Sequence, residues 1–159
     1  MLVIIAFTSC KKDVKPLDTN VNPVTTLNAP ADQTSISLQP ATGPGVVFQW
    51  AASSTQDLVL YEVAFDKADG DFSKPIYKVL SDGSGIQAQA TITQKILNTV
   101  ASLAGIQSSS SGTFKWAVIV SKATNAKVST ASHIIQVTRP AGFAVLPATL
   151  YLTGSNLRN

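Results

Sequence analysis

Acidic residues gather in one stretch of the chain, Asp66-Lys67-Ala68-Asp69-Gly70-Asp71, which suggests a cation site at first sight. A calcium loop of the EF-hand type requires oxygen ligands at fixed offsets and a bidentate Glu at its twelfth position. Counted from Asp66, the twelfth residue is Tyr77, while the third and fifth residues, Ala68 and Gly70, have no side-chain oxygen. The spacing therefore favours a glycine-containing hairpin turn, and we expect no bound metal.

Residue types that carry out catalysis are scarce in this chain. His133 is the only histidine, whereas a zinc site needs several His, Cys or acidic ligands. Glycosidases use paired carboxylates, but Glu62 is the only glutamate, and its nearest acids, Asp57 and Asp66, are expected at a strand end or on a solvated face. No serine stands in the elbow motif of a hydrolase nucleophile. We therefore expect that the protein is not an enzyme and holds no cofactor.

Aromatic side chains are the remaining candidates for chemistry, because their flat faces can stack on sugar rings. Trp50 and Trp116 stand in phase with the apolar residues of alternating segments, which indicates core positions that bury a large area. Tyr77 belongs to a short segment expected near a sheet edge, and Tyr151 to the last apolar segment of the chain. These two tyrosines are the carbohydrate-binding candidates.

The single cysteine, Cys10, stands where lipid chemistry is expected. Leu2 to Phe7 are all apolar, Thr8 and Ser9 are small, and polar residues follow Cys10. This order resembles a secretory signal that ends in a bacterial lipobox, in which the cysteine is acylated and becomes the first residue of the mature protein. Each buried acyl CH₂ contributes about 0.8 kcal/mol, so two or more chains anchor a protein stably. The alternative is a buried N-terminal strand with an incidental cysteine.

Composition indicates a secreted β-protein of one domain. Charged residues make up 13% of the chain, against about 25% in average soluble domains, and apolar residues make up 45% of the 159 residues. The net charge is +3, and Lys11, Lys12 and Lys15 stand together near the N-terminus. Lys and Arg do not cluster elsewhere, so we expect no nucleic-acid partner.

Short alternating segments separated by turn residues fill the chain from Gln33 to Pro140, and each is predicted to be a strand. The expected strands are Ser35–Leu38, Val46–Trp50, Leu58–Asp66, Ile76–Leu80, Ile86–Ile92, Phe114–Val120 and Lys127–Thr138.

One short helix interrupts this pattern. Thr91 to Gln94 fits a capping box, apolar residues follow at helical spacing, and Gly105 is expected to end the helix. About seven strands and one crossover helix favour an all-β fold, because two half-buried sheets can cover each other. We expect an immunoglobulin- or fibronectin-III-like antiparallel β-sandwich.

Four regions follow from these patterns. Residues 1–9 are the remnant of a signal peptide, and residues 10–30, which contain three prolines and no apolar periodicity, are the lipidated cysteine and an extended tether. Residues 31–140 form the β-sandwich domain. Residues 141–159 are a linker with an apolar segment that is either the first strand of a second, truncated domain or a C-terminal strand that pairs back onto the sandwich.

Several short motifs occur in a fixed order along nearly the whole chain. They are Ser9-Cys10-Lys11-Lys12-Asp13, Val47-Phe48-Gln49-Trp50, Tyr61-Glu62-Val63-Ala64-Phe65-Asp66, Asp71-Phe72-Ser73-Lys74-Pro75, Ile92-Thr93-Gln94-Lys95-Ile96-Leu97-Asn98, Phe114-Lys115-Trp116-Ala117-Val118 and Leu150-Tyr151-Leu152-Thr153-Gly154. With these motifs the chain resembles the N-terminal domain of SusE-type outer-membrane lipoproteins, which belong to glycan-uptake systems of Gram-negative bacteria.

The resemblance implies a lipid-anchored protein of the outer membrane, on its periplasmic face or on the cell surface. In such proteins the first domain is a sandwich spacer, and carbohydrate binding resides in later domains. The implied partners are a TonB-dependent transporter complex and a starch-like polysaccharide. Two alternatives remain open at this point: a structural or adhesive immunoglobulin-like surface module without a glycan role, and the spacer of a larger secreted hydrolase.

Overall fold

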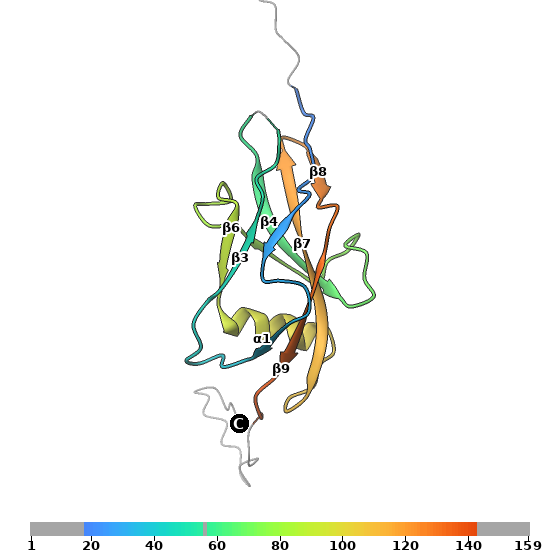
Figure 1. The fold of residues 1–159 in the computed structure, drawn as a ribbon. Coiled ribbons are helices and arrows are strands. Elements are labelled where there is room, and N and C mark those ends of the chain that lie inside the picture. The colour runs from blue at the N-terminus through green and yellow to red at the C-terminus, as the bar shows by residue number, and fades with distance from the viewer. Residues whose placement is uncertain (1–17, 56, 143–159) are drawn as a thin grey trace, which may run out of the picture.

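Two β-sheets face each other across a core of aromatic and aliphatic side chains (Figure 1). The computed structural model describes residues 18–55 and 57–142. Within these residues it contains nine strands in two sheets and one short helix. The expected all-β sandwich of immunoglobulin or fibronectin-III type is therefore confirmed.

The smaller sheet has three antiparallel strands in the order β1-β3-β6. Its members are β1 (Leu27–Ala29), β3 (Val46–Trp50) and β6 (Gln89–Ile92). Phe48 and Trp50 alternate with exposed residues along β3, so that their rings enter the core.

The larger sheet is organised around β7, which pairs on both of its edges. Its members are β2 (Thr34–Ser37), β4 (Leu60–Lys67), β5 (Tyr77–Leu80), β7 (Ser111–Lys122), β8 (Asn125–Val128) and β9 (His133–Thr138). The order is β2-β9-β7-β4-β5, and β8 pairs with the final residues of β7 on the edge that β9 occupies earlier. All pairs are antiparallel except β2 with β9, which differs from the fully antiparallel sandwich expected.

The single helix, α1 (Gln94–Leu103), carries the chain from β6 in one sheet to β7 in the other (Figure 1). The expected capping box at Thr91 to Gln94 is wrong, because Thr91 belongs to β6 and Thr93 is the N-cap, with its hydroxyl accepting from the Ile96 amide. Gln94 instead binds the preceding connection: its side chain accepts from the Gln39 amide at 2.5 Å and donates to the Pro44 carbonyl at 3.2 Å. Gly105 follows the helix with φ +90, as expected.

An aromatic cluster from both sheets fills the core. Phe48 contacts the rings of Trp116 and Phe65 edge-to-face at centroid distances of 4.9 and 5.5 Å, and Phe65 contacts Phe114 in the same way at 5.7 Å. These four rings are fully buried, and Trp50 is buried beside Tyr61. The core positions predicted for Trp50 and Trp116 are therefore confirmed.

The boundaries of several elements differ from those expected. The predicted strand Lys127–Thr138 is two strands, because Ser129 turns the chain by accepting from the Val118 amide and donating to the Ala131 carbonyl. Residues 82–88 form turns, so the predicted strand Ile86–Ile92 begins only at Gln89.

The segment from residue 18 to residue 30 is part of the domain and does not behave as the tether expected for residues 10–30. Val21, Val24 and Leu27 are buried in the core, and Leu27–Ala29 forms β1. The spacing of three between these apolar residues, interrupted by Pro23, matches neither a strand nor an amphipathic helix of usual length. The sandwich therefore includes residues that precede the expected boundary at residue 31.

We expect Trp116→Ala to lower the free energy of unfolding by about 3–5 kcal/mol, because a fully buried ring is replaced by a cavity. The Trp116 indole nitrogen has no hydrogen-bond partner, so the loss is one of packing. Urea unfolding measures the change. Leu103→Ala, at an exposed helix position, is the control and should change stability little. A loss below about 1 kcal/mol for Trp116→Ala would contradict the core described above.

Candidate functional site

Of the two residues predicted to bind carbohydrate, Tyr77 and Tyr151, the structure describes only Tyr77. Cys10 and Tyr151 lie outside the described residues. Tyr77 lies on β5, which is the edge strand of the larger sheet, as expected. Its side chain is half-buried and packs against the main core on the same face as Phe65, its partner in register on β4. Tyr77 therefore offers at most part of its ring to a ligand.

The acidic stretch after β4 is a folded loop. The buried Asp66 carboxylate accepts from the backbone amides of Lys67 and Phe72, each at 2.9 Å. It also lies close to Gly70, where an added Cβ would come within 2.2 Å of the carboxylate carbon. Among the described residues no group of three or more His, Cys, Asp or Glu side chains is placed to bind a metal. The Asp66 carboxylate is thus committed to shaping the turn.

This loop folds back over the outer face of the larger sheet. Phe72 is buried there against Ala64 and Ala117, and the Lys115 ammonium lies 5.5 Å from the centre of the Phe72 ring. The Ser73 amide donates to Asp71 at 2.9 Å, and hydrogen bonds from Ser73 hold the Asp71 pKa below its usual value. The motif Asp71-Phe72-Ser73 therefore has a structural use in covering the sheet.

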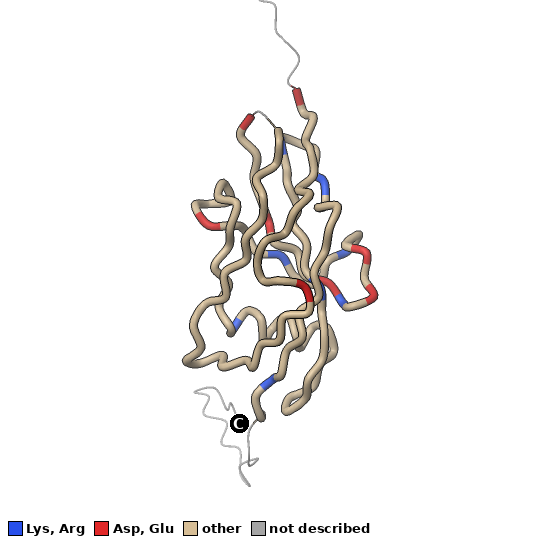
Figure 2. Tube along the Cα trace, in the orientation of Figure 1, with Lys and Arg blue, Asp and Glu red and all other residues tan. Residues whose placement is uncertain are grey.

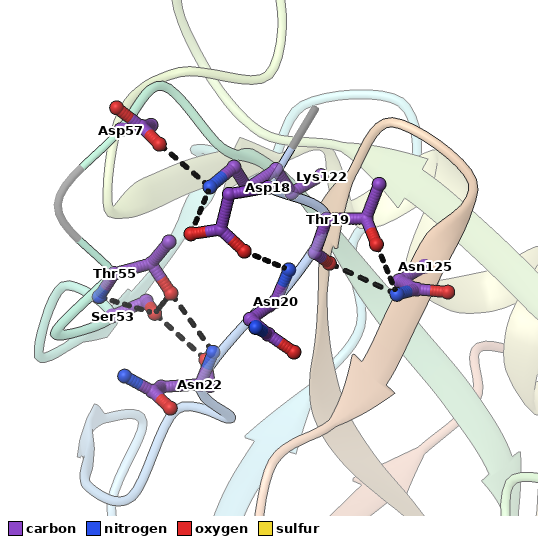
Figure 3. Close-up of polar contacts among 9 residues, drawn as sticks. All are labelled: Asp18, Thr19, Asn20, Asn22, Ser53, Thr55, Asp57, Lys122 and Asn125. Carbon is purple, nitrogen blue, oxygen red and sulfur yellow. Dashed lines mark hydrogen bonds and ion pairs between the residues drawn. The ribbon is translucent and has the colours of Figure 1, made fainter. Parts of the chain in front are cut away.

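A polar cluster surrounds a buried cation at the end of the sandwich where residue 18 lies (Figure 3). We call it the polar junction, and its members are Asp18, Thr19, Asn20, Asn22, Ser53, Thr55, Asp57, Lys122 and Asn125. Lys122 is the last residue of β7 and continues the inward-facing series of Trp116, Val118 and Val120. Only 8% of its side chain is exposed, so its ammonium requires partners.

Two carboxylates from distant parts of the chain supply those partners. The Lys122 ammonium lies 2.6 Å from Asp57, in the β3–β4 connection, and 3.5 Å from Asp18. The hydrogen bond with Asp57 is the main cause of a raised Lys122 pKa, despite the opposing effect of desolvation. The Asp18 pKa is lowered, chiefly by the Asn20 amide and further by Lys122. Both shifts favour the charged forms, of Lys122 and of Asp18.

Hydrogen bonds between uncharged groups also hold the N-terminal segment against the domain. The Asn125 side-chain amide donates to the carbonyl of Thr19 at 2.9 Å and to its hydroxyl at 3.0 Å. The Asn22 amide donates to Thr55 at 2.8 Å, and the Ser53 hydroxyl donates to the Asn22 carbonyl at 2.7 Å. Because Val21 is buried between these contacts, the chain is held against the domain from residue 18 onward.

The opposite end of β7 holds the C-terminal segment. The Arg139 amide donates to the Ser110 carbonyl at 3.0 Å, next to the first residue of β7. The Arg139 guanidinium donates to Asn98 on α1 at 2.9 Å and to the Ile106 carbonyl. The two ends of the described trace therefore lie at opposite ends of β7, as the blue and dark red segments of Figure 1 show.

Basic residues do not gather on one element of the described trace. Figure 2 shows Lys and Arg positions scattered among Asp and Glu positions. The pairs Lys78–Glu62 at 2.8 Å and Lys122–Asp57 at 2.6 Å neutralise part of this charge. Residues 18–55 and 57–142 contain eight Lys or Arg and eight Asp or Glu, so the net charge of +3 comes from the rest of the sequence.

Comparison with models of protein families identifies the family of the chain. The family described as SusE outer membrane protein matches residues 12–119, which include β1 to β6, α1 and most of β7. The chain belongs to the SusE family. Comparison with curated proteins and with solved structures found no match.

Membership of the SusE family makes this chain an outer membrane protein. Within the described residues, the one helix is too short to cross a bilayer. The SusE motifs recognised in the sequence occupy structural positions: Phe48 and Trp116 fill the core, Asp66 shapes a loop, and Asn98 binds Arg139. The polar junction was missed by the sequence reasoning, although Lys122 stands in phase with the buried residues of β7.

We expect Lys122→Met to loosen the N-terminal segment without unfolding the sandwich. The methionine can occupy the same buried position, but it cannot bind Asp18 and Asp57. Amide exchange at Asn22 should become roughly two- to fivefold faster, the range for partly exposed ion pairs, while β4 and β7 remain protected. Lys78→Met removes a surface pair of the same kind and is the matched control. Unchanged exchange at Asn22 in Lys122→Met would contradict the role of Lys122.

The Asp18 pKa gives a second test of the polar junction. The Asp18 pKa is lower in the folded protein than the ordinary value of 3.8. The stabilisation by Asp18 is therefore complete above a pH of about 3.8, and it is lost as the pH falls through the folded-state pKa. In Lys122→Met the Asp18 pKa should rise but stay below 3.8, because the Asn20 amide remains. Carboxyl carbon NMR measures it, with Asp71 as an unaffected internal control. A full return to 3.8 would assign the whole shift to Lys122.

Proposed function

We infer that this domain is a non-catalytic spacer of an outer-membrane glycan-binding and uptake system, anchored by lipid on Cys10. The observation that carries the proposal is the separation, along β7, of the segment attached at Lys122 and the segment attached by Arg139. Lys122, at one end of this strand, binds the N-terminal segment, and Arg139 is bound beside its other end. A strand of 12 residues extends about 40 Å at about 3.3 Å per residue.

Both attachments restrict the direction in which the chain meets the domain. A flexible linker adjoining a domain normally leaves the two free to reorient. Here the N-terminal segment is held by two ion pairs and several hydrogen bonds, and the C-terminal segment by the Arg139 guanidinium. Such a domain transmits a fixed spacing between whatever it joins, which is the physical requirement for a spacer.

The acids of the described residues support a non-catalytic role. A general acid needs a raised pKa, whereas hydrogen bonds lower the pKa of Asp18, Asp71 and Asp82. For Asp82 the largest cause is the Thr91 amide, which donates at 3.0 Å. Glu62 is paired with Lys78. The lowered pKa values favour the ionised forms of Asp18, Asp71 and Asp82, and all four carboxylates have local partners.

The lipid anchor is tested by Cys10→Ala in the full chain with its native leader. We expect this variant to fold but to leave the membrane fraction, because the acyl chains are the attachment. Near-ultraviolet circular dichroism of the tryptophans reports folding, and Ser9→Gly, which keeps a small residue before the cysteine, is the control. Retention of Cys10→Ala with membranes would contradict lipid anchoring.

The spacer role is tested by glycan binding of the full-length Cys10→Ala protein. We expect no retardation in native gels containing amylopectin and no heat of binding in calorimetry, because Tyr77 is the one aromatic side chain of residues 18–55 and 57–142 that is not buried. Binding would make the domain a recognition module. Loss of that binding in Tyr77→Ala, but not in Phe72→Ala, would then identify Tyr77 as the contact.

A further inference from the structure

Four exposed aliphatic residues stand at the start of β4, at the end of β5 and in the connections that adjoin them. We call them the leucine patch; they are Leu58, Leu60, Leu80 and Ile86. Leu58 is 74% exposed, and the other three are between 43% and 53% exposed. Leu60 and Leu80 lie together, since both side chains come within 3.3 Å of the position that a Cβ on Gly85 would take, and Ile86 follows Gly85.

Three acids adjoin the leucine patch, and two of them are paired with lysines. The third, Asp82, stands between Leu80 and Ile86 in the sequence and accepts hydrogen bonds from the Thr91 amide and hydroxyl, without a Lys or Arg partner among the described residues. Glu62 stands opposite Leu80 in the β4–β5 register and is neutralised by Lys78 at 2.8 Å. Asp57, which precedes Leu58, is neutralised by Lys122 at 2.6 Å. An aliphatic surface on which two of the three neighbouring carboxylates are paired with lysines fits a hydrocarbon partner better than it fits a sugar, which needs free polar groups.

The leucine patch begins at the end of the domain that is nearest to the lipid anchor in the chain. Leu58 follows Asp57, and Asp57 shares Lys122 with Asp18 in the polar junction. Asp18 is eight residues after Cys10, and eight residues span at most about 28 Å when fully extended. This step rests on the proposed acylation of Cys10, which would hold Asp18, and with it the end of the domain where the leucine patch begins, near the bilayer.

We propose that the leucine patch docks on the lipid surface of the membrane in which Cys10 is anchored. A short tether makes the contact intramolecular, with an effective concentration in the millimolar range, so a contact too weak to bind membranes alone becomes occupied. Docking would turn the polar junction and the start of β4 toward the bilayer. It would thereby set the angle between β7 and the membrane surface. The anchored domain then has a defined orientation.

The test uses the acylated full-length protein with Leu58→Cys. Acylation blocks Cys10, so the thiol introduced at position 58 is the only free one, and it takes a polarity-sensitive fluorophore. The protein is placed in phosphatidylethanolamine–phosphatidylglycerol vesicles with or without brominated lipid. Ser108→Cys, exposed at the other end of the domain, is the matched control. We expect a blue shift and loss of most of the fluorescence with brominated lipid at position 58, and neither change at position 108.

A second variant adds Leu60→Ser and Leu80→Ser to Leu58→Cys. Both leucines are exposed, so the fold should persist, while the quenching at position 58 should be lost and the protein should stay with the vesicles. For the protein with Leu58→Cys alone, vesicle binding without quenching at position 58 would overturn the docking but keep the anchor. A blue shift without lipid quenching would assign the patch to a second copy and also overturn it. A protein that does not join the vesicles would contradict the anchor and the docking together.

Discussion

The burial of one face of β7 is the constraint on which the rest of the structure depends. β7 pairs with β4 on one edge and with β9 and β8 on the other, so both of its edges are satisfied. Its inward face presents Phe114, Trp116 and Val118 to the core, and the same alternation brings Lys122 inward at the end. A cation in that position costs free energy unless it is paired, and Asp57 and Asp18 are its partners. The pairing that satisfies Lys122 also attaches the N-terminal segment to the sandwich.

This attachment connects the core to the proposed function. The same strand that fills the core has the N-terminal segment bound at one end and Arg139 bound beside the other. Side chains that could have formed a binding site are used elsewhere: the aromatic rings are mostly in the core, and the acids accept hydrogen bonds or pair with lysines. What the domain offers to its surroundings is therefore its length, its orientation and the exposed leucine patch.

Local patterns in the sequence predict the elements whose burial follows a regular period. The alternation around Phe48, Phe65 and Trp116 predicts both the strands and the core, and Gly105 predicts the end of the helix. Residues 18–30 are not predictable in this way, because Val21, Val24 and Leu27 are buried at a spacing typical of no single element. The polar junction is also beyond local reasoning, since Lys122 is 104 residues from Asp18 and 65 from Asp57. Only the packing of the two sheets brings these residues together.

As a spacer, this SusE-family domain holds the segments around Asp18 and Arg139 at a fixed separation. The most direct measurement is the distance between spin labels on Asn20→Cys and Ala141→Cys in the Cys10→Ala protein, by double electron–electron resonance. Both positions are exposed and lie beside the two attachments. For a rigid spacer we expect a single narrow distribution of distances on the order of 40 Å, the extent of a 12-residue strand. A broad or multimodal distribution would show that the ends move independently of the sandwich and would contradict the spacer.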